Sequence, residues 1–240
     1  MTRVDRNQKK YEYGLWAYWT FEEPEPTTIY DQSGNQRDGT GANLTRVQGI
    51  SGYAYWFNGE NSGVKIPSDI AVLPDVPLSV ALWFYSPEYP DHSMYMLYKN
   101  QEYRISTPFR ALYVWGPSLG VYQSEYELAF FVSAASGDIF GISTDAVYGK
   151  WTFVVGTWDG EIVRLYVNGE LKAEDTYSGN LYQQAWPLRI GRSEGGYYFY
   201  GIIDEVKIYS KALTPEEVKR MYMQYRMTKQ YPYKVYAYET

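Results

Sequence analysis

The feature that most constrains the fold is a hydrophobic pattern with a period of two residues. In residues 78–84, every second side chain is apolar and faces one side, as a half-buried strand requires. These side chains are Leu78, Val80, Leu82 and Phe84. Segments of the same kind recur at 14–21, 53–57, 111–115, 127–132, 151–158, 162–167 and 201–209. Many short strands of this kind predict an all-β chain.

Turn signals between these segments predict how the strands pair. Asp159-Gly160 separates 151–158 from 162–167, and Asn168-Gly169 folds the second of these onto 170–174. Both dipeptides tolerate the positive φ angles of the type I′ hairpin turn. Three consecutive antiparallel strands follow, which is typical of a two-sheet antiparallel β-sandwich or jelly roll.

One short C-terminal helix interrupts this pattern. Thr214 can cap it, Pro215 suits its first position, and Glu217 stands three residues after the cap. An apolar stripe at helical spacing then predicts a helix to about residue 226. The stripe consists of Val218, Met221, Tyr222 and Tyr225.

No linker, repeat or low-complexity tract divides the chain, so we expect one domain over residues 14–226. Residues 1–13 form an N-terminal extension, and residues 227–240 form a C-terminal extension. The latter alternates apolar side chains on both faces from Tyr231 to Tyr238. We therefore predict that it adds an extra strand to a sheet edge.

Composition excludes several classes of function. The chain has no cysteine and a single histidine, His92, which excludes disulfides, cysteine-based zinc sites and most histidine-dependent catalysis. Its net charge is −6 without a basic run, so we expect no nucleic-acid partner. No apolar run approaches the roughly 18 residues of a membrane span, and no signal peptide is visible. We therefore expect no membrane insertion.

Several segments resemble, in order, the blocks of laminin-G-like domains of the concanavalin A-like lectin/glucanase superfamily. They include YAYWFNGENSGVKIP (53–67), WTFVVGTWDGEIVRLYVNGEL (151–171) and GIIDEVKIYSKALTPEEVKRMY (201–222). The resemblance covers roughly residues 14–225, with a poor match over 85–149. It implies a jelly roll of two antiparallel sheets, in a family whose members bind sugars, proteins or surfaces. Some relatives are glycoside hydrolases.

The carboxylates do not support hydrolysis. Related hydrolases carry a Glu-x-Asp-x-Glu motif on one strand, and Glu-x-Asp does not occur in this sequence. The nearest spacings are Glu23-Pro24-Glu25 and Glu125-Tyr126-Glu127, which we interpret as exposed loop or strand-edge charge. The G-x-S-x-G match at 116–120 lacks a following helix and is interpreted as a turn. We expect no enzymatic activity.

The resemblance also implies a structural calcium ion. Asp204 stands at the position of the family's calcium ligand in the last strand block, and the loop beginning at Asp31 resembles the other half of that site. Carboxylates and loop carbonyls are the ligands that calcium prefers. The alternative stays open that Asp204 caps a turn and Asp31 begins an Asx turn.

Tyrosine is in excess, with 28 residues against nine phenylalanines, and suits half-wet positions where a ring packs and a hydroxyl meets a ligand. The candidate ligand-binding residues are Tyr95, Tyr103, Tyr113, Trp115, Trp186, Tyr197 and Tyr198. Further aromatic candidates are Tyr98, Tyr122 and Tyr200. Each one alone is also explained by packing, but a sandwich core cannot absorb all of them.

These observations predict a non-catalytic module that binds a glycan or cell-surface polymer outside the cell. The alternative is a structural or attachment subunit of a virion, fibre or coat, binding copies of itself or other coat proteins. The absence of a visible signal peptide and the tyrosine-rich segment 231–238 favour that alternative.

Overall fold

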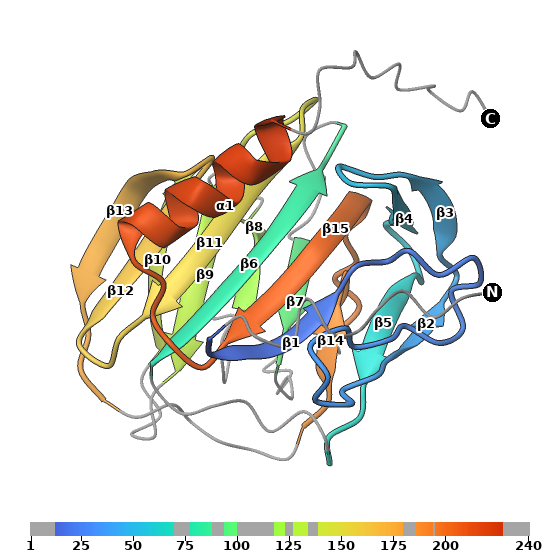
Figure 1. Cartoon of the computed structure of the whole chain (residues 1–240), viewed down its shortest axis with the longest axis horizontal. Helices are drawn as coiled ribbons and strands as arrows, with labels where there is room; N and C mark the ends of the chain where they lie inside the picture. The colour runs from blue at the N-terminus through green and yellow to red at the C-terminus, as the bar shows by residue number, and fades with distance from the viewer. Residues whose placement is uncertain are drawn as a thin grey trace, which may run out of the picture.

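The computed structural model describes residues 13–69, 77–87, 94–99, 118–122, 127–133, 139–179, 186–193 and 195–227. Two antiparallel sheets stack face to face, and one helix lies on the outer face of one of them (Figure 1). The predicted all-β sandwich is therefore confirmed. Most of both predicted extensions lies outside the described residues, so the domain boundaries stay a prediction.

The sheet nearer the viewer in Figure 1, here the front sheet, has eight strands. Its order is β13 (Glu170–Thr176), β12 (Ile162–Val167), β11 (Thr152–Trp158), β6 (Leu78–Tyr85), β15 (Tyr200–Tyr209), β4 (Tyr53–Asn58) and β3 (Thr45–Gln48). The eighth strand, β1 (Leu15–Trp19), pairs with β15.

The back sheet has seven strands. Its order is β10 (Ile139–Asp145), β9 (Glu127–Ser133), β8 (Ser118–Tyr122), β7 (Met94–Tyr98), β14 (Leu188–Ile190), β5 (Gly63–Ile66) and β2 (Thr40–Ala42). Strands far apart in sequence, such as β5 and β14, thus lie side by side.

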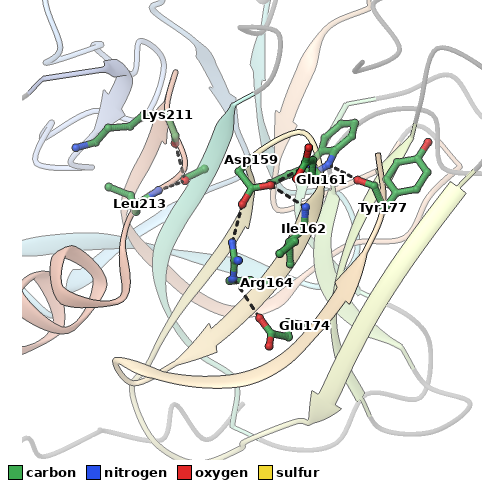
Figure 2. A network of polar contacts seen from close by, with 10 residues as sticks. Asp159, Glu161, Ile162, Arg164, Glu174, Tyr177, Lys211 and Leu213 are labelled. Carbon is green, nitrogen blue, oxygen red and sulfur yellow. Dashed lines mark hydrogen bonds and ion pairs between the residues drawn. The ribbon is translucent and has the colours of Figure 1, made fainter. Parts of the chain in front are cut away.

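Both predicted hairpins are present, but only one has the expected turn. Asn168 and Gly169 have φ angles of 53° and 82°, as a type I′ turn requires. At the β11–β12 turn only Gly160 has a positive φ, and the Asp159 carboxylate accepts the backbone N–H groups of Glu161 and Ile162. Figure 2 shows the same carboxylate pairing with Arg164, which also reaches Glu174.

The main core lies between the two sheets. The alternate side chains of β6, from Leu78 to Phe84, are fully buried there, as predicted. The opposite face of β6 is buried as well, because Ala81 and Trp83 lie beneath the helix. The expectation of a half-buried strand is therefore wrong for β6, whose two faces contact two separate apolar clusters.

The helix, α1 (Pro215–Met227), begins with the predicted capping box. The Glu217 N–H donates to Thr214 Oγ1, and the Thr214 N–H donates to the Glu217 carboxylate. Its apolar stripe packs on the outer face of the front sheet, with the Tyr222 ring stacked 5.8 Å from that of Trp83. No helix in the described part of the chain is long and apolar enough to cross a membrane.

Candidate functional site

The outer face of the back sheet around β7 and β14 gathers four of the seven predicted ligand residues. Tyr95 lies on β7, Trp186 precedes β14, and Tyr197 and Tyr198 follow β14. The other three, Tyr103, Tyr113 and Trp115, lie outside the described residues. We call the surface of β7, β14, β5 and the 191–199 hairpin the β7–β14 face.

Strand alternation explains which side chains reach this face. Val64 and Ile66 of β5, like Leu188 and Ile190 of β14, point into the core between the sheets. Lys65 and Arg189 therefore lie on the outer side of the sheet, where Lys65 is exposed but Arg189 is buried, and they are direct cross-strand partners. Arg189 in turn is paired with Tyr98 of β7, so a row of outward residues crosses three strands.

A bulge brings two tyrosines of β7 together on this face. Pairing with β8 shifts register between Tyr95 and Leu97, so Tyr95 and Tyr98 share one face although they are three residues apart. Their ring centroids lie 4.9 Å apart, and the Tyr197 ring lies 6.1 Å from that of Tyr95. Tyr95 and Tyr98 are almost fully buried, whereas Tyr197 is half-buried.

The 191–199 hairpin places the more accessible aromatic rings. Gly191, with a φ of 76°, starts the turn after β14, and backbone bonds join Ser193 to Tyr197 and Phe199 to Gly191. The Arg192 guanidinium lies 5.1 Å from the centroid of the Tyr198 ring. Tyr197 and Tyr198 are thus held by a closed hairpin.

Cationic side chains, which the sequence analysis did not single out, surround these rings. Lys99 is 3% exposed, and its Nζ donates to the Trp186 carbonyl at 2.7 Å. Burial lowers the pKa of Lys99 to about 8. In the described part of the chain, Lys65, Lys99 and Arg192 form no ion pair with a carboxylate.

Asp31, one of the two predicted calcium ligands, organises its own loop. Its carboxylate accepts the backbone N–H groups of Tyr18, Ser33 and Arg37 and the Ser33 hydroxyl. These four hydrogen bonds occupy most of the lone pairs of the carboxylate oxygens, which leaves little room for a cation to bind them. The loop geometry therefore fits the Asx-turn alternative better than a calcium ligand.

Asp204, the other predicted ligand, is fully buried on β15. Its Oδ2 accepts the backbone N–H groups of Ile50 and Ser51, whereas Oδ1 has no hydrogen-bond partner among the described residues. Burial, aided by the neighbouring Glu205, raises the pKa of this carboxyl well above its usual value. Within the described residues, no group of three or more acidic or histidine side chains could hold a metal ion. Any cation here would need backbone carbonyls beside Asp204 Oδ1.

The calcium prediction has a direct test. An ion held by Asp204 in the native state only is expected to raise the melting temperature by about 5 °C or more in calcium relative to EDTA. Asp204→Asn keeps the side chain's shape but should abolish that difference, whereas Asp69→Asn, at an exposed acid, should retain it. Identical melting curves of the wild type in calcium and in EDTA would contradict the site.

The carboxylates considered for hydrolysis form no catalytic pair in the described residues. Glu23 is 8% exposed and accepts the Tyr30 N–H, so its interpretation as exposed loop charge is wrong. Burial raises its pKa, but its neighbour in the motif, Glu25, is exposed. Glu127 accepts the Ser143 hydroxyl, and Glu125 lies outside the described residues.

The two stacked antiparallel sheets and the capped C-terminal helix define a lectin-type jelly-roll domain. Residues 58–219 match the family described as the concanavalin A-like lectin/glucanases superfamily, in its laminin-G class. The match covers more than half of the chain, and the chain belongs to this family. The resemblance stated from the sequence is thereby confirmed.

Solved structures share this fold at low sequence identity. The binding domain of botulinum neurotoxin serotype G aligns with a TM-score of 0.68 and 14% identity, covering 88% of this chain and 51% of that one. Domain 4 of AbnA, a GH43 extracellular arabinanase from Geobacillus stearothermophilus, was solved in complex with arabinotriose. It aligns with a TM-score of 0.64 and 20% identity, covering 86% of this chain and 97% of that one. The binding domain of Paraclostridial Mosquitocidal Protein 1 aligns with a TM-score of 0.66 and 16% identity, covering 91% of this chain and 53% of that one. The chain spans about half the length of the neurotoxin binding domain. No curated protein sequence matches it.

Proposed function

We propose that this domain is a non-catalytic module that binds a glycan or cell-surface polymer through the β7–β14 face. The observation that carries the proposal is the packing of the Tyr197 ring on Tyr95, with Tyr198 and Trp186 in the segments that flank β14, beside Lys99 and Arg192, which form no ion pair with a carboxylate in the described part of the chain. Sugar rings pack on aromatic side chains, and their hydroxyls pair with polar groups at the rim. The AbnA domain was solved with arabinotriose, and the neurotoxin and mosquitocidal relatives are named as binding domains. Such a role fits an extracellular or surface location.

Within this face, the half-buried rings are the ones that a ligand can reach. Trp186, Tyr197 and Tyr198 combine packing with partial exposure, whereas Tyr95 is fully buried and supports Tyr197 from below. We therefore assign direct contact to Tyr197 and Tyr198 and a supporting role to Tyr95.

Single substitutions test this assignment. Tyr197→Ala and Tyr198→Ala should each weaken binding to glycans on an array by about tenfold, which corresponds to about 1.4 kcal/mol. Tyr53→Ala, which removes an exposed tyrosine from the front sheet, should leave binding unchanged. Equal losses for all three variants would contradict the site.

The non-catalytic role has its own test. Release of reducing ends from laminarin or xylan by the wild type, lost in Glu127→Gln, would contradict it.

The alternative function, an assembly subunit, depends on the C-terminal segment 228–240, which lies outside the described residues. Because α1 completes its packing by Met227, truncation after that residue should leave a folded domain with little change in far-UV circular dichroism. If the segment pairs with a neighbouring copy, sizing chromatography should show a full-length oligomer that truncation dissociates. A monomer in both forms, with equal melting temperatures, would contradict the assembly role.

A further inference from the structure

We infer that residues 228–240 pack in cis on the outer face of the front sheet, against an apolar row that crosses β6, β15 and β4 beside α1. This placement goes beyond the proposed function and does not depend on it. A segment held by its own domain is not available to a neighbouring copy, so the placement opposes the assembly alternative. Three features of the described residues support it: the row, the direction of α1, and the side chains that α1 leaves partly uncovered.

The apolar row crosses the outer face of the front sheet in direct register. Tyr85 of β6 is the cross-strand partner of Ile202 on β15, and Ile202 is in turn the partner of Trp56 on β4. Residues next to them on each strand belong to the core between the sheets, so these three side chains point outward. Trp151, whose ring lies 6.2 Å from that of Tyr85, and Val47 of the edge strand β3 pack against the same cluster. We call these five residues the Trp56 row.

The helix α1 ends beside this row. Just before α1, the Leu213 N–H donates to Ser79 Oγ near the start of β6. Towards the end of α1, the rings of Tyr222 and Tyr225 lie 5.8 and 5.7 Å from that of Trp83, near the end of β6. The helix therefore runs along β6 in the same direction, as Figure 1 shows. Since Tyr85 is only two residues beyond Trp83, α1 ends where the Trp56 row begins.

Side chains of the row stay partly exposed where α1 does not reach. The helix leaves Trp83 only 3% exposed, whereas Trp56, Trp151 and Val47 are half-buried. Trp151 packs against both the cluster beneath α1 and the cluster of the row, so the two apolar surfaces are continuous. A segment that continues from α1 onto the row would bury these side chains as α1 buries Trp83.

The segment after α1 has the length and the side chains for this position. Three strand spacings, about 14 Å, separate β6 from β3, and five extended residues span that distance. Residues 228–240 are 13 residues, and Lys234 is the only charged residue from Tyr231 to Tyr238. Because the row crosses the strands, side chains make these contacts. They differ from the backbone pairing at a sheet edge that alternation alone predicts.

Photo-crosslinking of the full-length chain tests this placement directly. With p-benzoylphenylalanine in place of Trp56, we expect the main crosslinked peptide of the monomer to come from residues 228–240. The same group in place of Tyr53 is the control, because Tyr53 is exposed on the same strand but alternates to the other face, and it should not crosslink to that segment. A crosslink in a dimer-sized band would show that a neighbouring copy covers the row. That result, crosslinks to other parts of the chain alone, or no crosslink would overturn the inference.

Thermal unfolding provides a second measurement. Truncation after Met227 should lower the melting temperature by at least about 3 °C, and so should Trp56→Ala in the full-length chain. In the truncated protein Trp56→Ala should have less than half of that effect, because its partner is already absent. Tyr53→Ala should have the same effect in both lengths. Equal melting temperatures with and without the segment, or additive effects at Trp56, would overturn the inference and leave the proposed function standing, since neither measures glycan binding.

Discussion

Glu205→Leu is expected to lower the free energy of unfolding by about 3–5 kcal/mol, because it removes the shared acceptor of a buried polar cluster. The carboxylate of Glu205 accepts the hydroxyl groups of both Tyr18 and Tyr225. Without it, the buried Tyr18 hydroxyl and the partly buried Tyr225 hydroxyl lose this acceptor. Urea denaturation followed by tryptophan fluorescence measures the change.

The position of Glu205 explains the size of this effect. It lies at a bulge of β15, with a φ of 54°, where the register with β6 shifts between Asp204 and Lys207. Its carboxylate joins three elements, because Tyr18 belongs to β1 and Tyr225 to α1. Burial, and then the negative charge of Glu205, raise the pKa of both tyrosines, so they keep their protons and donate. The Lys207 ammonium lies 4.5 Å from the Tyr18 ring centroid, as a cation–π contact.

Conservative variants separate hydrogen bonding from packing. Glu205→Gln keeps the size and an acceptor oxygen and should cost about 1–2 kcal/mol, and Tyr225→Phe about 1 kcal/mol. Removing all three polar groups, in Tyr18→Phe/Glu205→Leu/Tyr225→Phe, should recover part of the stability that Glu205→Leu loses. A Glu205→Leu protein as stable as the wild type would show that the cluster does not hold α1 on the sheet.

Local patterns predicted the elements of this fold well. The capping residues Thr214 and Glu217 form the expected bonds, and the Asn168-Gly169 turn has the expected dihedral angles. Each of these features is decided by a few neighbouring residues. The burial of Trp83 on the second face of β6 was missed, because it depends on α1, which lies far along the chain.

The site was predicted only in part for the same reason. Aromatic excess pointed to Tyr197 and Tyr198, but nothing in the sequence singled out Lys65 and Arg189, which are cross-strand neighbours. That contact depends on the strand order β7-β14-β5, which no local pattern encodes. The bulge that brings Tyr95 and Tyr98 to one face was not predicted either, because no glycine or other turn-forming residue marks it in the sequence.

The packing of the two sheets against each other predicts a second large effect, at Gly156. This residue lies in the middle of β11, and a Cβ added to it would lie 2.4 Å from the ring of Phe130 on β9. Phe130 is fully buried in the core between the sheets, so its ring cannot turn away into solvent. We therefore expect Gly156→Val to destabilise the protein by about 3 kcal/mol, although valine favours strands.

A double-mutant cycle and a matched control show whether this contact is the cause. Phe130→Ala alone should lower the free energy of unfolding by about 3–5 kcal/mol, because it leaves a cavity. In the double mutant with Gly156→Val, the loss should be about 2 kcal/mol smaller than the sum of the two single losses, because the valine side chain fills part of the cavity and no longer clashes with the ring.

Gly141 of β10 offers the control, since an added Cβ would lie 2.3 Å from the ring of Phe131. Gly141 is exposed and Phe131 half-buried, so that ring can turn into solvent, and Gly141→Val should cost under about 1 kcal/mol. Strictly additive losses at Gly156 and Phe130 would mean that β11 and β9 do not face each other at this point.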